Sequence, residues 1–542
     1  MRNLIQNKSD RIAEVVLYSI LALFILSIFW INFHSALFYR MDTYTYSYES
    51  RLMFEQKTCF PEDWVFGNQY HIISSPNLAA LFYGVFKDST LSMAITSSLS
   101  MILVLLAFLW CFKRHLGKTA LSAGLLCIGG GIIFGTSAAL YISGLQVLYT
   151  MASYYACYLI GLLLTLGCWL RLRNGERPGI VMILLVVVIN FALGMQSLRE
   201  ILILNIPLVL MEMLHAGRRL YQKESLPSVI LGNASSLWFT VALLAIELAG
   251  FVYMKSLDVL STPIIGELAI DLHPSALAAN IWASTKNLLR ISGMAIAMDG
   301  LRYFPISLCA FAIALDVFWV LFQIIRTNDE SALAKAVIFC VFSVLCVFGI
   351  GVFLMRTRDI YYFTYWLLAA LSIAYTIEKF DWNKWFIPSL AAICLINFYF
   401  SFIPDFKAYH KDNARMQAFT EKLIEQGNAR VLYTSSRPIF AAASHDQIIS
   451  QSFWLDINME SGYPLTVFPS DKHTVIYDDA HYQGALFCIS EGYLSYLEKE
   501  APSVYREYLL SHLEFVDSLT LSSRERFVIY RPIGRIISPL SL

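Results

Sequence analysis

The 542-residue chain is 57% hydrophobic and only 15% charged, and its mean hydropathy is +0.58. Soluble globular domains carry about 25% charged residues, and their apolar residues do not gather in long runs, so this composition excludes an ordinary soluble protein. The formal net charge of zero gives no indication of nucleic-acid binding. The chain is predicted to be a polytopic α-helical membrane protein.

Apolar segments long enough to cross the hydrocarbon core of a bilayer, roughly 30 Å, recur along the chain. About eleven spans are predicted, near residues 14–36, 89–112, 119–143, 147–170, 179–196, 200–215, 228–254, 303–325, 336–355, 361–377 and 385–403. The first is too long for a secretory signal and lacks a small-residue cleavage site, so we expect it to remain as an anchor. The weakest points of this count are the link near 144–147 and the segment 275–300.

Basic residues collect in alternate short loops and indicate the orientation. They are Lys113, Arg114 and Lys118, then Arg171, Arg173 and Arg177, then Arg218, Arg219 and Lys223. These loops are expected on the same side as the basic N-terminus, which the positive-inside rule makes cytoplasmic. An odd number of spans then places the C-terminus outside the cytoplasm.

The first loop outside the cytoplasm, residues 37–88, carries the most distinctive pattern. It opens with Asp42, and the side chains that follow at helical spacing are Tyr44, Tyr48, Leu52 and Glu55. This spacing predicts an amphipathic helix over 43–57 along the membrane interface, although the alternation TYTYSY also fits an edge strand. Ser75 followed by Pro76 predicts the start of a second short helix, 76–86.

From about residue 405 the sequence changes character. The run KAYHKDNARMQAFTEKLIEQGNARVLYTSS predicts an amphipathic helix that stops at Gly427 and is followed by a strand. Short apolar runs such as HTVIYDD and RFVIYRP come later, separated by polar stretches. The sequence therefore predicts a transmembrane domain over 1–404 and an extracytoplasmic mixed α/β domain over 405–542.

Cysteine usage gives little indication of chemistry. Eight of the ten cysteines lie in predicted spans, where cysteine behaves as a small hydrophobic residue. No Cys or Cys/His spacing indicates zinc. Cys59 and Cys488 lie outside the predicted spans, and two unrelated thiols are favoured over a disulfide between them.

The order of features in the first loop resembles the GT-C superfamily of membrane glycosyltransferases. The likeness is to the branch that contains protein O-mannosyltransferases and lipid A aminoarabinose transferases. In that branch the loop has an aspartate–glutamate pair, a tyrosine-bearing helix, a turn such as GDW and a proline-led helix. This chain has, in that order, Asp42, Tyr44 to Tyr48, Glu62-Asp63-Trp64 and Ser75-Pro76. It departs at Thr43, where the family has glutamate, so the second carboxylate's role is left unfilled or passes to Glu49, Glu62 or Asp63.

The resemblance implies transfer of a sugar, with inversion, from a polyprenyl-phosphate donor to an extracytoplasmic glycan, lipid or protein. The acceptor hydroxyl must lose a proton as it attacks, and Asp42 is the predicted base. Tyr44, Glu62 and Asp63 are predicted substrate-binding residues. A role for Asp42 as a helix cap explains its position equally well from the sequence alone. No cofactor is firmly implied. A divalent metal ion needs several oxygen ligands, and Asp42 is the only carboxylate that the resemblance assigns to the site.

The leaving phosphate needs cationic partners, and arginine suits its geometry better than lysine does. The candidates are Arg199 in QSLRE, Arg302 in MDGLRYFP, and Arg356 and Arg358 in MRTRDIYYF. The last two resemble an arginine–tyrosine element of the family. Arg199 could instead pair with Glu200. Arg356 and Arg358 could snorkel to lipid headgroups or pair with Asp359. Glu247 and Asp316 lie within predicted spans, where a carboxylate is a functional hypothesis by default.

Two other function classes stay open. A transporter or flippase for lipid-linked sugars would share the apolar helices and buried charges but would not need Asp42, whereas a receptor or assembly scaffold would leave the first loop unexplained. No Asn-x-Ser/Thr acceptor occurs in the predicted outer regions, which favours a bacterial plasma membrane over the endoplasmic reticulum.

Overall fold

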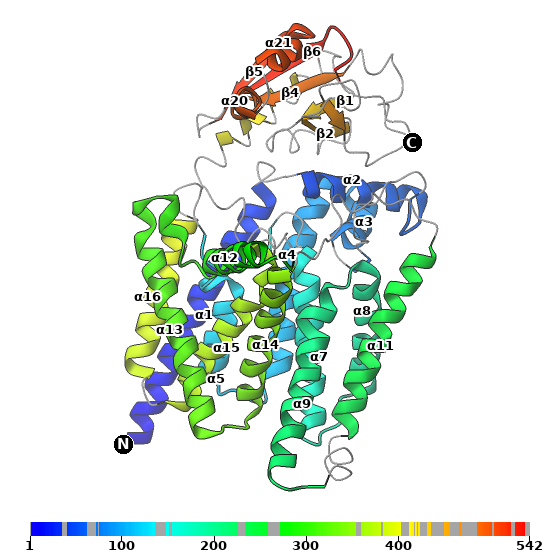
Figure 1. The fold of residues 1–542 in the computed structure, drawn as a ribbon. Coiled ribbons are helices and arrows are strands. Elements are labelled where there is room, and N and C mark those ends of the chain that lie inside the picture. The colour runs from blue at the N-terminus through cyan, green and yellow to red at the C-terminus, as the bar shows by residue number, and fades with distance from the viewer. Residues whose placement is uncertain are drawn as a thin grey trace. The chain divides into compact units, whose positions relative to one another are not determined.

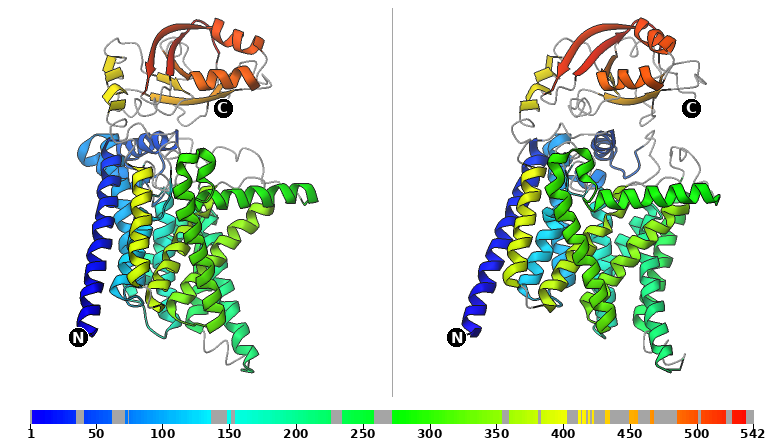
Figure 2. Two further views of the ribbon diagram at one scale, coloured as in Figure 1. Left: turned by 90° about the vertical axis from the view of Figure 1, so that its left-hand side faces the viewer. Right: turned by 60° about the vertical axis from the view of Figure 1, so that its left-hand side comes forward.

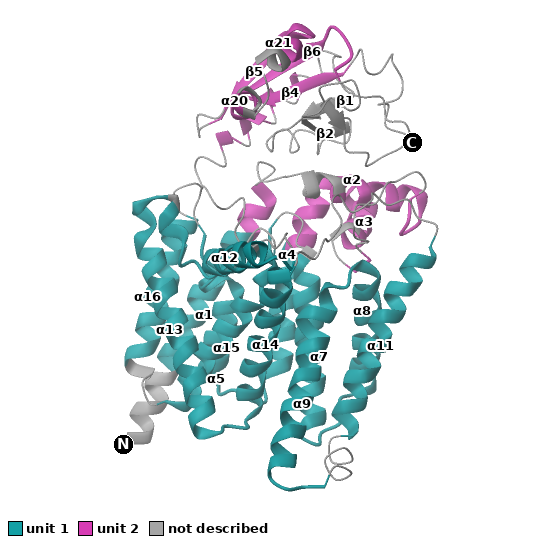
Figure 3. Cartoon of the chain, in the orientation of Figure 1, with its two compact units in different colours: residues 1–28, 98–257, 266–404 teal, residues 29–97, 258–265, 405–542 magenta. Residues whose placement is uncertain are grey.

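The structure, a computed structural model, describes residues 2–34, 41–61, 72–73, 75–135, 148–150, 154–225, 234–257, 272–353, 359–380, 383–402, 411–412, 414–416, 418–419, 421–422, 431–434, 449–455, 465–467, 485–500, 503–521 and 526–536. The chain divides into two compact units (Figure 3). Unit 1 comprises Met1–Ile28, Ser98–Leu257 and Gly266–Pro404. Unit 2 comprises Phe29–Ser97, Asp258–Ile265 and Asp405–Leu542.

Unit 1 is helical, and its long helices run alongside one another (Figure 1). Helices α1 (Arg2–His34) and α4 (Ser89–Phe112) each lie partly in this unit. Its other described helices are α5 (Lys118–Leu126), the π-helix η2 (Cys127–Gly131), α7 (Tyr154–Arg173), α8 (Ile180–Gln196), the π-helix η3 (Ile201–Asn205), α9 (Ile206–Tyr221), α11 (Ala234–Ser256), α12 (Pro274–Ile291), the 3-10 helices η4 (Ile296–Asp299), η5 (Leu301–Tyr303) and η6 (Asp359–Tyr362), α13 (Phe304–Thr327), α14 (Ala332–Phe353), α15 (Thr364–Lys379) and α16 (Asn383–Ser401).

Eight helices among the described residues are long and apolar enough to cross a membrane. They are Arg11–His34, Ser89–Phe112, Tyr155–Arg173, Ile201–Tyr221, Ala234–Ser256, Leu301–Thr327, Ala332–Phe353 and Ile360–Lys379. Two of the shorter apolar helices, Ile180–Gln196 and Trp385–Ser401, coincide with predicted spans. The chain is therefore a polytopic helical membrane protein, while the total of about eleven spans stays a prediction.

The predicted span 119–143 is not a continuous helix, and this part of the prediction is wrong. Helix α5 passes into η2, and the backbone is no longer helical at residues 132–135. Asn397 of α16 donates its amide N–H groups to the carbonyls of Gly130 and Gly131 at 3.0 and 3.1 Å. Broken helices persist at membrane depth only where protein groups satisfy the exposed carbonyls, and Asn397 does so here.

Helices α8 and α11 cross at very close range because each has a glycine at the crossing point. A Cβ atom on Gly194 would lie 2.2 Å from the backbone oxygen of Glu247. A Cβ atom on Gly250 would lie 2.2 Å from the backbone oxygen of Phe191. Small residues allow this approach between membrane helices, so either glycine can be replaced only if the helices separate.

Unit 2 contains α2 (Met41–Gln56) and α3 (Ser75–Phe86), which confirm the two helices predicted in the first loop and exclude the edge strand. The two helices pack through Phe54 and Tyr83, whose ring centroids lie 5.9 Å apart. The Lys87 ammonium lies 3.6 Å from the centroid of the Phe54 ring. Glu49 is buried within α2.

The C-terminal part of unit 2 contains a six-stranded mixed sheet of order β3-β2-β1-β4-β6-β5. Its strands are β1 (Val431–Thr434), β2 (Ile449–Leu455), β3 (Leu465–Val467), β4 (Leu486–Ser490), β5 (Leu513–Thr520) and β6 (Arg526–Pro532). Strand β1 is parallel to β2 and β4, whereas β3, β5 and β6 pair antiparallel to their neighbours.

The C-terminal part of unit 2 also contains helices α20 (Glu491–Glu500) and α21 (Ser503–Ser511). The described residues between 411 and 422 are helical too, within the predicted amphipathic helix. The predicted mixed α/β composition is confirmed, with strands at VLYT and RFVIYRP, while HTVIYDD lies outside the described residues. Cys488 is buried in β4, Cys59 is exposed, and neither forms a disulfide in the described part of the chain.

Candidate functional site

Arg199 lies where α8 ends, and three tyrosine rings surround its guanidinium group. The carbon of that group lies 4.8 Å from the ring centroid of Tyr155, 5.5 Å from that of Tyr158 and 4.7 Å from that of Tyr361. All three distances are within the range of about 6 Å at which an aromatic face attracts a cation. The four side chains form what we call the Arg199 box.

The local sequence explains how Arg199 is held. Ser197 is extended and ends α8, and its hydroxyl oxygen accepts the backbone N–H of Arg199 at 3.3 Å. The same hydroxyl lies 2.8 Å from the phenol oxygen of Tyr158. A single serine therefore links the backbone at Arg199 to Tyr158 of α7.

The Arg199 box joins two segments that lie far apart in the sequence. Tyr361 belongs to η6, which follows Arg356 and Arg358 directly in the chain. Arg356 and Arg358 lie outside the described residues. The structure thus brings Arg199 to the segment that carries the predicted arginine–tyrosine element.

The two α7 tyrosines of the box were not among the predicted site residues. Tyr155 and Tyr158 are three residues apart, which places both on one face at the start of a helix. That spacing indicates that the two tyrosines act together, but it does not indicate that their partner is Arg199. The partner comes from a turn that follows a different helix.

Two carboxylates lie near the box in the interior of unit 1. Glu200 and Glu247 are both fully buried, and Glu200 interacts electrostatically with Glu247 and with Arg199. Both oxygens of each carboxylate have no hydrogen-bond partner among the described residues. The predicted intramembrane acid Asp316 differs, because it accepts the Thr376 hydroxyl at 2.7 Å and so joins α13 to α15.

Of the site residues predicted in the first loop, the structure describes only the backbone of Asp42 and Tyr44. The backbone of Asp42 lies in the first turn of α2. The side chains of Asp42 and Tyr44, and all of Glu62 and Asp63, lie outside the described residues. Their catalytic and binding roles therefore stay predictions.

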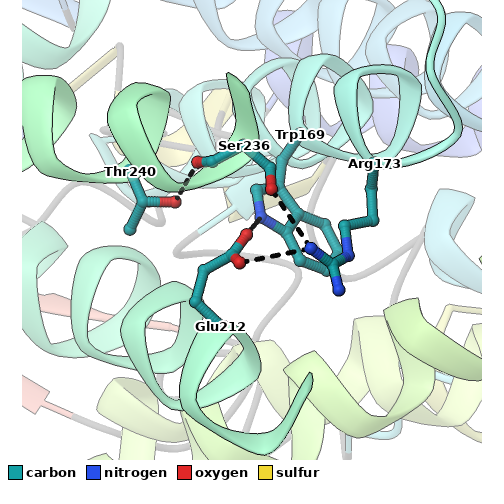
Figure 4. A network of polar contacts seen from close by, with 5 residues as sticks. All are labelled: Trp169, Arg173, Glu212, Ser236 and Thr240. Atoms are coloured by element: carbon teal, nitrogen blue, oxygen red, sulfur yellow. Dashed lines mark hydrogen bonds and ion pairs between the residues drawn. The ribbon is translucent and has the colours of Figure 1, made fainter. Parts of the chain in front are cut away.

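A buried polar network connects α7, α9 and α11 (Figure 4). It lies at the C-terminal end of α7, opposite to the Arg199 box. Arg173 and Glu212 form an ion pair at 3.4 Å, with side chains only 8% and 6% exposed. Trp169 donates its indole N–H to Glu212 at 2.8 Å, and Arg173 donates to the Ser236 hydroxyl at 3.4 Å. These contacts join three helices, so the network is structural.

Several loops of unit 1 meet near the C-terminal end of α7. Arg114 pairs with Glu176 at 3.1 Å, and the Gly117 N–H donates to the Glu378 carboxylate at 2.8 Å. A pocket of about 460 Å³ lies beside these contacts and is lined by His115, Asn174, Ser331, Ala332, Leu333, Glu378 and Lys379. None of the predicted site residues lines it, so we assign the candidate site to the Arg199 box.

Asp329 anchors this loop end. Burial alone would raise the pKa of its carboxyl group, but hydrogen bonds from the Ser331 backbone N–H, Lys379 and Tyr375 outweigh burial and lower the pKa to about 2. The pKa is lower in the folded protein, so the contribution to stability is present above about pH 4 and is lost as the pH falls towards 2.

We therefore expect Asp329→Asn to lower the thermal midpoint of the purified protein at neutral pH. The difference from wild type should narrow as the pH falls from about 6 to about 3. Glu330→Gln changes a neighbouring exposed carboxylate and is the matched control. A difference between Asp329→Asn and wild type that is constant across this pH range would contradict the assignment.

Among the described residues, no group of three or more His, Cys, Asp and Glu side chains is placed to hold a metal ion. Comparison of the chain with protein-family models finds no match, and comparison with curated proteins finds none either.

Proposed function

We propose that this chain is a membrane glycosyltransferase of the GT-C type. It transfers a sugar, with inversion, from a polyprenyl-phosphate donor to an extracytoplasmic glycan, lipid or protein acceptor. The observation that carries the proposal is the Arg199 box, because it joins Arg199 to the segment directly after Arg356 and Arg358. In this proposal the arginines bind the donor phosphate and Asp42 is the base.

The position of the box within unit 1 supports this assignment. Tyr155 lies at the start of α7, whereas the basic residues Arg171 and Arg173 lie at its end. The positive-inside rule makes the basic end cytoplasmic, so the box is proposed to lie on the opposite side of a bacterial plasma membrane. A lipid-linked sugar used outside the cytoplasm would present its phosphate at that depth.

The chemistry of the box also suits a phosphate. Stacking on tyrosine faces fixes the plane of a guanidinium group without neutralising its charge. A fixed arginine can form two parallel hydrogen bonds to phosphate oxygens, and such charge-assisted bonds are stronger than neutral ones. Leaving-group charge that develops during transfer would be stabilised there.

The transporter alternative is favoured by a different observation. Buried carboxylates within membrane helices, such as Glu200 and Glu247, are common on ion and proton pathways. Reconstituting the full chain with labelled polyprenyl-phosphate sugar and candidate acceptors distinguishes the two functions. A covalent glycosylated product supports the transferase, whereas movement of intact donor across the bilayer without product supports the transporter.

We expect Arg199→Ala to weaken donor binding about tenfold to a hundredfold, because it removes a charge-assisted bond worth about 1.5–3 kcal/mol. Arg199→Lys should restore binding only in part, since lysine keeps the charge and lacks the planar fork. Donor saturation of the reconstituted protein is the measurement. Arg114→Ala, which removes an exposed arginine at the opposite end of unit 1, is the control. Equal saturation curves for Arg199→Ala and wild type would return Arg199 to a structural role.

A further inference from the structure

Helix α12 lies across the ends of the membrane-spanning helices of unit 1 (Figure 2). It packs against η6 and α14. Asn280 donates its side-chain N–H to the carbonyl of Val352 at 3.0 Å, and the Trp366 indole donates to the carbonyl of Ile291 at 3.1 Å. These bonds fix the rotation of α12 about its own axis, and thereby determine which residues face outward.

In the middle of α12 the burial pattern is the reverse of that in a water-soluble helix. Its polar residues Asn280 and Ser284 are buried against the protein. Ile281 and Trp282 are instead 46% and 68% exposed. In water this arrangement would leave the Ile281 and Trp282 side chains uncovered, which is unfavourable in proportion to their exposed apolar area.

Two exposed cations continue the side of the helix that carries Trp282. Lys286 stands one turn after Trp282, and Arg290 stands one turn after Lys286. A helix with an exposed tryptophan followed by two exposed cations matches the membrane interface, where indole rings occupy headgroup depth and cations contact anionic lipids. The transverse orientation of α12 relative to the spans is the one that such a helix requires.

We propose that α12 is an interfacial helix that binds the phosphate headgroups of anionic bilayer lipids through Lys286 and Arg290, with Ile281 and Trp282 inserted beside them. This surface does not depend on the proposed transferase activity. Because α12 packs on η6, the side of unit 1 next to Tyr361 then borders lipid rather than water.

The first test measures retention of lipid by the purified full chain in native mass spectrometry. Phosphatidylglycerol should bind the Lys286→Gln/Arg290→Gln variant at least about tenfold more weakly than wild type, since each cation contributes about fivefold. Phosphatidylcholine binding should not change. The charge-matched control is Lys118→Gln/Arg326→Gln, which removes two exposed cations elsewhere in unit 1. Unchanged phosphatidylglycerol binding by the α12 variant would overturn the proposal.

A second measurement does not depend on the folding of that variant. A photo-crosslinking amino acid at position 282, in the otherwise wild-type chain in native membranes, should become attached to lipid. The same amino acid at position 284, which is buried, is the control and should crosslink within the chain. Attachment of position 282 to another protein chain would identify a protein interface instead, and absence of any lipid adduct at position 282 would equally overturn the proposal.

Discussion

Replacing Asp42 by asparagine is expected to lower the sugar-transfer rate of the purified protein by a factor of roughly 10² to 10⁴, the usual cost of losing a general base. Asparagine has nearly the same size as aspartate but cannot accept a proton at neutral pH. It also caps helices about as well. Since Asp42 lies in the first turn of α2, the substitution separates a catalytic role from a capping role.

The measurement compares the transfer rate and the thermal midpoint of wild type and Asp42→Asn, purified in parallel and assayed under the same conditions. Asp88→Asn is the matched control, because the Asp88 carboxylate accepts the backbone N–H of Leu91 at 2.8 Å at the start of α4. That variant makes the same chemical change at another helix start and should keep near-normal turnover. If folded Asp42→Asn retained more than about a third of wild-type turnover, the base would have to be sought elsewhere, first at Glu62 and Asp63.

The second large effect concerns stability. Glu212→Ala should lower the free energy of unfolding by about 3–5 kcal/mol, because it removes one partner of a buried ion pair and leaves the other charge without compensation. Arg173 would lose its carboxylate, and the Trp169 indole would lose its acceptor (Figure 4). The Arg173 side chain is only 8% exposed and Trp169 is fully buried, so water replaces the lost bonds poorly.

Denaturant or thermal unfolding of the purified protein measures the effect. Glu176→Ala breaks the Arg114–Glu176 pair, whose side chains are 59% and 45% exposed, and should cost at most about 1 kcal/mol. Arg173→Met combined with Glu212→Leu should be less destabilising than Glu212→Ala, since it removes both charges together. Equal decreases in the free energy of unfolding for Glu212→Ala and Glu176→Ala would show that the buried pair contributes no more to stability than the exposed pair does.

Local features of the sequence determined the membrane class and the position of most helices. Length and apolarity suffice for this because every backbone N–H and C=O in the hydrocarbon region must be satisfied within a segment. The helix over 43–57 was also predictable from spacing, but the choice against a strand depended on α2 packing against α3 through Phe54 and Tyr83. The strand RFVIYRP was predictable because it is a short apolar run between polar stretches.

The break after α5 illustrates what the sequence left undecided. The glycines at 129–131 permit a break but do not require one, because glycine is common in intact membrane helices. The carbonyls exposed by the break must find donors, and Asn397 supplies them from a helix far along the chain. Whether such a partner lies within reach is a property of the packed bundle.

The candidate site divides in the same way. Arg199 was identifiable from the sequence, because an arginine at the end of an apolar segment is expensive and therefore conspicuous. Its environment was not, since Tyr155, Tyr158 and Tyr361 come from two other elements and meet it only when the helices pack. Likewise α12 was a weak point of the span count, and its outward-facing residues were decided only by its contacts with α14 and α15. Hydropathy acts on each segment separately and could determine the membrane class, whereas the site depends on contacts between distant segments and was decided by the tertiary structure.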